Sequence, residues 1–348
     1  MTTLPFDQTW MGLDELRRPG MSPEFGPEWL EFLQEVRPHV SPAALPPVEV
    51  LSYRADGEHG VVVFVEESDL KLNLPAGVWR ASRALEYPVS GFHARIPLAH
   101  SLAFGVTGMI PQTRRRMLDR LAQVFEGHAA ERHADYVQVS RVPIGSLEDH
   151  VLRARGYVAY PNEYDHVLIV PESDYEAYLM TRSTNFRHNV RRARRKLEQQ
   201  AGRIAIMQPA TMVVDDVYRL FFDLCNHKNI EPYYHREYFA QAAQRPEFGV
   251  VGIFLRDRMI ACATWWATRD HISFKHAGLD YRHLHEVDSY TNLLQGVVQA
   301  AMATGTRVAH LGLTNSLQKQ RLGARPVVTQ RRILPLTQAL GSVLPPHY

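Results

Sequence analysis

One order of secondary-structure elements is repeated in the two halves of the sequence. Each half contains an amphipathic helix, an apolar strand, a short basic helix, a glycine (Gly156 or Gly323) and a further strand. The expected ranges are 113–125, 136–142, 146–155 and 157–159 in the first half, and 287–304, 308–313, 316–322 and 327–334 in the second. Because the elements recur in the same order at similar spacing, we predict an internal duplication with a boundary near residues 171–174.

Three further strands are expected before the long helix of the second half. Their ranges are 249–255, 260–268 and 271–279, and the segments RDRM and RDH between them are typical of tight turns. Strands joined in this way form an antiparallel meander. The second half is therefore expected to consist of a meander, a helix, a strand, a short helix and a closing strand.

Composition restricts the class of protein. The 348 residues allow two or three domains, and 45% hydrophobic residues with 22% charged residues is ordinary for a chain that buries a core. The net charge of +2 means that any electrostatic binding surface must be local. The two cysteines, Cys225 and Cys262, cannot form a zinc cage, and we expect reduced thiols. The start of the sequence does not form a signal peptide, and no apolar run is long enough to span a membrane, so we expect a cytoplasmic protein.

A local concentration of positive charge lies between Thr181 and Arg203. This segment contains eight Lys/Arg residues and one acid, Glu198. Apolar residues at helical spacing predict that one face docks on the core, and the arginines of the flanks are Arg187, Arg191, Arg194 and Arg195. Guanidinium groups suit phosphate oxygens, so we interpret these four as a donor- or phosphate-binding surface. The alternative is a solvated helix face with counterions.

Three segments resemble the GNAT acyltransferase superfamily and, within it, the Fem-type branch of aminoacyltransferases. They are YLMTRSTNFRHNVRRARRKLEQQ (178–200), LLQGVVQAAMATGTRVAHLGL (293–313) and LQKQRLGARPV (317–327). The resemblance implies an α+β fold of tandem GNAT-like domains, each a mixed, largely antiparallel sheet flanked by helices. It implies a degenerate domain over 1–170, for support or acceptor binding, and a catalytic domain over 171–348. The implied activity is amide formation by direct attack of an acceptor amine on an activated acyl donor, without a cofactor.

The identity of the donor depends on the segment GLDYRHLHEVDSYTN. GNAT enzymes that use acetyl-CoA carry a glycine-rich loop here, whose backbone N–H groups hold the pyrophosphate, but this segment has no glycine between Leu279 and Gly296. The resemblance therefore favours aminoacyl-tRNA as donor, with a small-molecule or peptide amine as acceptor. An N-acyltransferase using acyl-CoA or a carrier-protein thioester remains an alternative, as does a non-catalytic RNA- or phosphate-binding module.

Four residues are candidates for the chemistry. Lys319 matches a lysine that lies close to the acyl carbonyl in the Fem-type pattern, where an ammonium would stabilise the developing oxyanion. The alternative is an exposed helix lysine. In the strand HISFKHAGLD, alternation places Phe274 and His276 on one face and Lys275 on the other, so only one of Lys275 and His276 faces the site. His276 could relay the proton of the amine, or be an ordinary sheet histidine. Glu286 is a general-base candidate.

Several aromatic residues could line the substrate pocket. These are Tyr233, Tyr234, Trp265, Trp266 and Tyr281. They could form the wall of the acceptor pocket or stack on the terminal adenine of a tRNA, and the alternative is packing in the rim and core. Asp288 is expected to be the N-cap of the following helix. His283 and His285 lack a third ligand at suitable spacing, so no metal site is expected.

Overall fold

The computed structural model describes residues 27–41, 45–46, 48–55, 58–67, 90–95, 104–106, 111–170, 174–268, 270–313 and 315–343. They form two compact units. The first unit contains the described residues up to Glu31, those from Leu45 to Glu163, and those from Val328 onward. The second contains the described residues from Phe32 to Ala44 and from Tyr164 to Val327. The helix α1 (Pro27–Val36) and the 3-10 turn η4 (Arg37–His39) come first in the chain.

The first unit is a mixed sheet covered by helices. Its strands are β1 (Val48–Ala55), β2 (Glu58–Glu67), β3 (Gly91–Ala94), β4 (Phe104–Val106), β5 (Tyr136–Pro143) and β12 (Arg325–Pro335), and its helices are α3 (Pro111–Glu131), α4 (Leu147–Ala154) and α11 (Gln338–Val343). The strand order is β1-β2-β3-β5-β12, with β4 paired to β2. The pair β3–β5 is parallel, whereas the pairs that β2 makes and the pair β5–β12 are antiparallel.

The second unit repeats this topology with additional elements. Its strands are β6 (Val158–Ile169), β7 (Gly202–Met207), β8 (Phe248–Leu255), β9 (Arg258–Ala267), β10 (His271–Leu279) and β11 (Val308–His310). Its helices are α5 (Tyr175–Met180), α6 (Thr184–Gln199), α7 (Val214–Lys228), α8 (Arg236–Ala242), α9 (Ser289–Ala303) and α10 (Ser316–Arg321), with 3-10 turns η5 (Pro209–Thr211) and η6 (Tyr281–His283). The strand order is β6-β11-β10-β9-β8-β7, with β10–β11 parallel. The expected α+β class and largely antiparallel pairing are confirmed.

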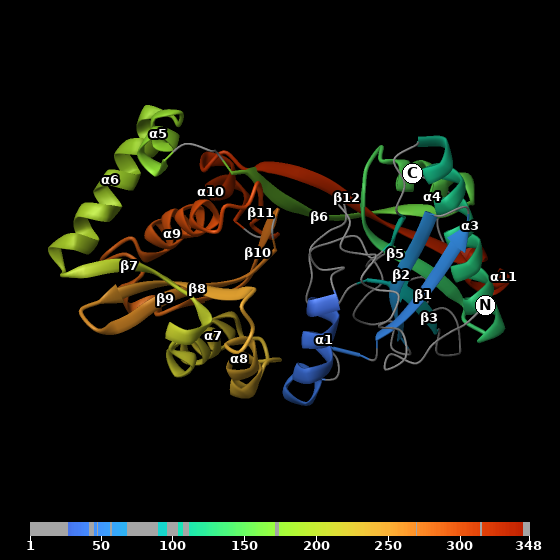
Figure 1. The fold of residues 1–348 in the computed structure, drawn as a ribbon, viewed down its shortest axis with the longest axis horizontal. Helices are drawn as coiled ribbons and strands as arrows, with labels where there is room; N and C mark the ends of the chain where they lie inside the picture. Colours follow the sequence, from blue (N-terminus) through green and yellow to red (C-terminus); the bar gives the residue numbers. More distant parts are fainter. Residues whose placement is uncertain are drawn as a thin grey trace. The chain divides into compact units, whose positions relative to one another are not determined.

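The two halves of the sequence exchange their last strands. β6 follows α4 in the chain but pairs with β11, and β12 follows α10 but pairs with β5. β6 therefore continues from the first unit into the second, and β12 continues from the second into the first (Figure 1). The compact units are thus not contiguous in sequence. The division into 1–170 and 171–348, and the roles assigned to those halves, remain predictions.

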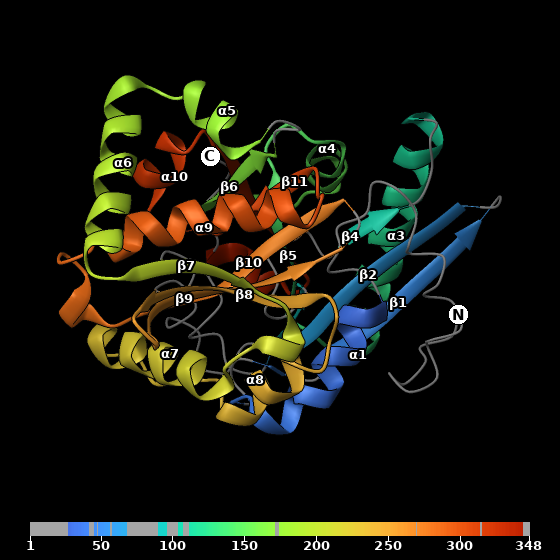
Figure 2. The same ribbon diagram turned by 60° about the vertical axis from the view of Figure 1, so that its left-hand side comes forward.

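Helices cover both faces of the second sheet. Figure 2 shows α9 on one face of β7, β8 and β9, with α7 and α8 on the other. The α9 side buries Val251, Ile272 and Val298. On the other side α7 approaches β10 so closely that a Cβ added at Gly278 would lie 2.6 Å from Leu220 Cβ. A residue with a side chain at position 278 would therefore separate α7 from the strand.

No helix of the described part of the chain is both long and apolar enough to cross a membrane.

Candidate active site

The strands β10 and β11 pair over only three residues each. His271–Ser273 lies parallel to Val308–His310, and beyond these positions β11 ends while β10 continues along β9 to Leu279. Polar groups of the following segments gather beyond the end of β11. In the GNAT superfamily, which this sequence resembles, the fourth and fifth strands splay apart and the acyl group lies in the gap. The resemblance therefore implies that the acyl group lies between β10 and β11.

A β-bulge lies in β10 at this position. The register with β9 shifts between Phe274 and Ala277, so Lys275 and His276 occupy the irregularity. Phe274 packs in the α9-side core, with its ring centroid 6.3 Å from that of Trp265. The expectation that Phe274 and His276 share a face is wrong, because an extra residue in a bulge changes the alternation. Lys275 is half-buried.

His276 lies within an aromatic cluster on the α7–α8 side. Its Nε2 is 3.1 Å from the Tyr238 hydroxyl, and its ring centroid is 4.4 Å from that of Tyr234. The backbone N–H of His276 donates to Thr264 Oγ1. Burial raises the pKa of Tyr234 well above its ordinary value and also raises that of Tyr238. Both phenols therefore stay neutral and act as hydrogen-bonding groups.

The five aromatic residues expected to line a pocket do not form one wall. Trp265 and Trp266 are buried on opposite faces of β9, Trp265 beside Phe274 and Trp266 with its ring centroid 5.3 Å from that of Phe32. Tyr234 is buried too, whereas Tyr233 is half-buried. Tyr281, also half-buried, stacks on His227 with ring centroids 3.5 Å apart. The buried members have the environment expected of core packing.

Lys319 is buried, with 6% of its surface exposed, so it is not the exposed helix lysine of the alternative interpretation. Its Nζ donates to the carbonyl oxygen of Gly312, two residues beyond the end of β11, at 3.0 Å. Burial lowers the pKa of Lys319 to about 8, while the nearby charge of Asp165 acts in the opposite direction. His166 Nδ1 donates to the same carbonyl oxygen at 2.9 Å, and its Nε2 lies 2.8 Å from Ser316 Oγ.

A chain of three titratable residues, which sequence reasoning missed, lies beside Lys319. His310 Nδ1 is 3.1 Å from Asp165 Oδ2, and His310 Nε2 is 3.3 Å from His271 Nδ1. Asp165 is buried, and the two histidines are half-buried. A signal was present in the sequence, since DHVLIV and VAHLGL place charged or titratable residues within otherwise apolar strands.

The N-terminus of α9 carries acidic groups in place of a phosphate-binding loop. Asp288 occupies the N-cap position in the left-handed conformation (φ 47°, ψ 48°), but its side chain makes no capping hydrogen bond. Its carboxylate is instead 3.2 Å from Lys196 Nζ and 3.8 Å from Arg192 Nε, both on α6. Glu286 is exposed, with its Oε2 2.7 Å from His283 Nδ1. Two carboxylates at this helix end would repel a pyrophosphate.

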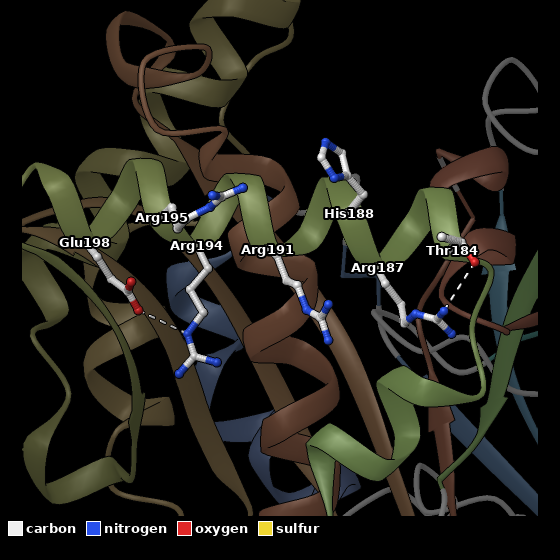
Figure 3. Close-up of a pocket in the computed structure, with 7 residues that line it drawn as sticks. All are labelled: Thr184, Arg187, His188, Arg191, Arg194, Arg195 and Glu198. Atoms are coloured by element: carbon white, nitrogen blue, oxygen red, sulfur yellow. Dashed lines mark hydrogen bonds and ion pairs between the residues drawn. The ribbon is translucent and has the colours of Figure 1, made fainter.

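The basic helix α6 docks as its sequence predicts. Ser183 caps its first turn, and Val190, Ala193 and Leu197 are buried. A hollow of about 590 Å³ lies along its outer side, and the lining residues are Thr184, Arg187, His188, Arg191, Arg194, Arg195 and Glu198 (Figure 3). Four of these seven are the arginines expected to bind phosphate. Figure 3 shows Arg187, Arg191 and Arg194 extending along one side of the helix and Arg195 along the other.

The four arginines differ in their partners. Arg187 donates to the carbonyl oxygens of Met180 and Arg182 at 3.0 and 2.9 Å, which fixes the end of α5. Arg194 forms ion pairs with Glu176 and Glu198 at 3.3 and 3.2 Å. Arg191 and Arg195 are exposed and have no carboxylate partner among the described residues. The uncompensated charge of α6 is therefore concentrated at Arg191 and Arg195.

The family comparison covers the same part of the chain. Residues 184–319 match the family model described as acetyltransferase (GNAT) domain. This segment is a GNAT acyltransferase domain. The matched segment begins at the first residue of α6 and ends at Lys319, so it contains the basic helix, the bulge in β10 and the end of β11. No curated protein sequence matches this chain significantly.

Solved structures with little sequence identity share the fold of this acyltransferase. The structure of FemX has a TM-score of 0.65 at 10% identity, covering 96% of this chain and 98% of that one. The C-terminal domain of a putative lysylphosphatidylglycerol synthetase from Agrobacterium fabrum has a TM-score of 0.53 at 9% identity, with 84% and 86% covered. L-PGS from Bacillus licheniformis has a TM-score of 0.53 at 10% identity, with 94% and 97% covered. The expected tandem fold and its resemblance to the Fem-type branch are confirmed.

Proposed function

We propose that this acyltransferase forms an amide bond by transferring an aminoacyl group from tRNA to an acceptor amine. The observation that carries the proposal is the exposed charge of Arg191 and Arg195 on the GNAT domain itself. Their side chains line a hollow of about 590 Å³, which leaves room for a phosphate backbone. Arginine guanidinium groups recognise phosphate oxygens with two parallel hydrogen bonds.

The N-terminus of α9 supports tRNA over CoA. Acyl-CoA would need the helix N-terminus to receive its pyrophosphate, and backbone N–H groups to approach it closely. Here that end carries Asp288 and Glu286, and the segment before it contains no glycine. Lys196 and Arg192, which approach Asp288, are thereby used within the protein. Arg191 and Arg195 of α6 stay exposed, without a carboxylate partner among the described residues.

The similar structures add support of a different kind. One of them bears the name putative lysylphosphatidylglycerol synthetase, which denotes a product that contains a lysyl group. An aminoacyl donor in this fold is consistent with such a product. The acceptor proposed here is an amine of a small molecule or a peptide.

Lys319 has the chemistry that aminolysis of an ester requires. The C–N bond forms, the C–O bond to the ribose breaks, and negative charge develops on the carbonyl oxygen before the leaving hydroxyl receives a proton. With its pKa lowered to about 8, the Lys319 amine is mostly protonated at pH 7, so it can stabilise that charge and still exchange its proton readily. His276 and Glu286 remain candidates for proton transfer to and from the amine.

The proposal is tested by measuring donor binding and transfer together. Binding of fluorescent aminoacyl-tRNA is followed by anisotropy at several salt concentrations, for the wild type and for Arg191→Gln/Arg195→Gln. If each arginine contacts one phosphate, the double variant should bind more weakly, and the slope of log K against log salt should fall by roughly 1.5. Radiolabelled aminoacyl transfer to a panel of amines measures activity.

A matched control uses Arg115→Gln/Arg116→Gln, two exposed arginines on α3. This variant should retain the salt dependence of the wild type. If both double variants lost the same affinity for aminoacyl-tRNA, binding would be non-specific, and this would contradict the proposal. Tight binding of acyl-CoA with no transfer from any charged tRNA would replace it with the CoA-dependent alternative. RNA binding without any acyl transfer would favour the non-catalytic module.

A further inference from the structure

Asp165, His310 and His271 lie on three neighbouring strands of the second unit. They come from β6, β11 and β10, and each contacts the next through a hydrogen-bonding atom, at 3.1 Å and 3.3 Å. The two imidazole rings are within 17° of parallel, with centroids 5.5 Å apart, so their nitrogens meet at the ring edges. Each ring nitrogen of His310 thus has a hydrogen-bonding partner: Nδ1 contacts a carboxylate and Nε2 contacts a second histidine.

The inner end of this chain lies next to Lys319. The Lys319 ammonium and the His166 ring donate to one acceptor, the Gly312 carbonyl, at 3.0 and 2.9 Å. Asp165 precedes His166 in β6, and its carboxylate raises the pKa of Lys319 against the effect of burial. The buried carboxylate of Asp165 therefore acts on the buried Lys319 ammonium through its charge, near the end of β11.

The outer end of the chain reaches the surface. His271 is the first residue of β10 and is half-buried, and the adjacent residues Asp270 and Arg307 are exposed. Among the described residues, His166 is a further titratable group close to the chain, and its two nitrogens contact Gly312 and Ser316. The order Lys319, Asp165, His310, His271 thus leads from the buried site to water.

We propose that Asp165, His310 and His271 form a proton relay that connects Lys319 with solvent during acyl transfer. This rests on the proposed amide-forming reaction, because an acceptor amine that arrives as an ammonium must release one proton beyond the one that ends on the leaving hydroxyl. Asp165 takes up the proton that Lys319 releases and passes it to His310 Nδ1; His310 Nε2 then passes a proton to His271 Nδ1, and His271 Nε2 passes one to water. Each step breaks one N–H or O–H bond and forms another, and no oxidant or reductant is involved.

One test does not depend on activity. The chain has five lysines, so ¹⁵N-lysine labelling gives few signals, and the exchange of Lys319 Nζ protons with water can be measured by NMR. In His271→Ala this exchange should slow several-fold, and added imidazole should restore it. His150→Ala, an exposed histidine of α4, is the control and should leave the exchange unchanged. Unchanged Lys319 exchange in His271→Ala would overturn the relay.

A second test uses catalysis and separates the relay from a structural role. His271→Gln keeps a hydrogen-bond donor for His310 but cannot pass a proton, so kcat should fall about 10- to 100-fold while KM for the donor stays the same. Imidazole should restore kcat in His271→Ala, with unchanged thermal stability in both variants. Wild-type kcat in His271→Gln would contradict the relay. Transfer from acyl-CoA instead of tRNA would refute the proposed donor but leave this test applicable.

Discussion

The two units share one topology, and a parallel strand pair occupies the same position in each. The pair is β3 with β5 in the first unit and β10 with β11 in the second. Their registers correspond, since Phe92 pairs with Val137 in one unit and Ile272 with Ala309 in the other, and all four are buried. Each long helix, α3 or α9, covers that apolar face. The opposite face of each pair carries polar residues, and these are where the units differ.

In the first unit the polar residues contact one another. His93 Nε2 lies 2.6 Å from Ser140 Oγ, and Gln138 Nε2 lies 2.9 Å from His93 Nε2, with all three residues buried. In the second unit the corresponding positions carry Ser273, His310 and Gly312, and His310 joins a chain that includes charged residues. A cluster of hydrogen-bonded polar groups stabilises a sheet, whereas a chain of titratable groups that leads towards a buried lysine can move protons.

The exchanged strands show a second contrast. In the first unit Arg332 of β12 is buried against Asp149 of α4, and its Nη1 also donates to the Tyr157 carbonyl at 3.1 Å. At the corresponding place in the second unit, His166 of β6 contacts Ser316 of α10. The short helix is thus held by an ion pair in one unit and by a histidine–serine contact in the other. We infer that the first unit is specialised for stability and the second for chemistry.

The largest effect is expected when the ion pair of the first unit is broken. Arg332→Met leaves the Asp149 carboxylate buried without its charged partner, which typically costs about 3–5 kcal/mol. Urea unfolding should show this loss. The matched change in the second unit, His166→Gln, should cost about 1 kcal/mol, because it alters hydrogen bonds to a carbonyl and a hydroxyl and breaks no ion pair with a carboxylate. Equal losses of unfolding free energy in Arg332→Met and His166→Gln would contradict this contrast between the two units.

The next largest effect concerns Lys319. Lys319→Met should lower kcat about 100-fold, equivalent to about 2.7 kcal/mol of transition-state stabilisation, because a donor near the developing oxyanion is lost. Transfer rates under saturating donor measure this. The variant should be at least as stable as the wild type at pH 7, since a buried ammonium is replaced by an apolar side chain. A fully active Lys319→Met protein would refute the catalytic assignment.

The polar cluster of the first unit should affect stability and leave catalysis intact. Ser140→Ala removes a hydrogen-bonding partner of buried His93 and Gln138, so a loss of about 1–3 kcal/mol is expected. Thermal unfolding measures the loss, and kcat should equal that of the wild type. His310→Gln in the second unit should lower kcat. If Ser140→Ala were the slower enzyme, the division between supporting and catalytic units would be reversed.

The smallest expected effect is a pH dependence of stability. The pKa of Lys319 is about 8 in the folded protein and about 10.5 when unfolded, so between these values the unfolded state binds more protons. The contribution of Lys319 to the free energy of unfolding therefore rises as the pH increases from about 8 towards 10.5. The difference in Tm between Lys319→Met and the wild type should be greater at pH 7 than at pH 9.5. A Tm difference between the two proteins that is the same at both pH values would mean that Lys319 is not desolvated.

Local sequence patterns predicted much of the second unit. The ranges expected for β8, β10, α9 and α10 agree with the structure within two residues, because each has a clear apolar period and a turn or glycine at its end. The docking face of α6 was predicted for the same reason. The strand expected over 308–313 ends earlier, at His310, because the chain leaves β10 there.

Other features arise from contacts between distant residues or from the backbone. The bulge at Lys275 and His276 changes which side chain faces α7, and alternation alone does not indicate where a strand gains a residue. The relay residues come from three strands, so no single segment carries the pattern. Four of the basic residues of α6 are also partly neutralised by Glu176, Asp288 and backbone carbonyls, which the count of charges did not anticipate.

The exchange of β6 and β12 makes the two halves of the sequence depend on each other for folding. A fragment ending at residue 170 would carry β6 without its partner β11 and would leave the β12 side of β5 uncovered. A fragment beginning at residue 171 would have the reciprocal defect, and each would present an unpaired strand edge prone to association. Produced together, the two fragments should complete each other's sheets. We therefore expect each half of the sequence to need the other in order to fold.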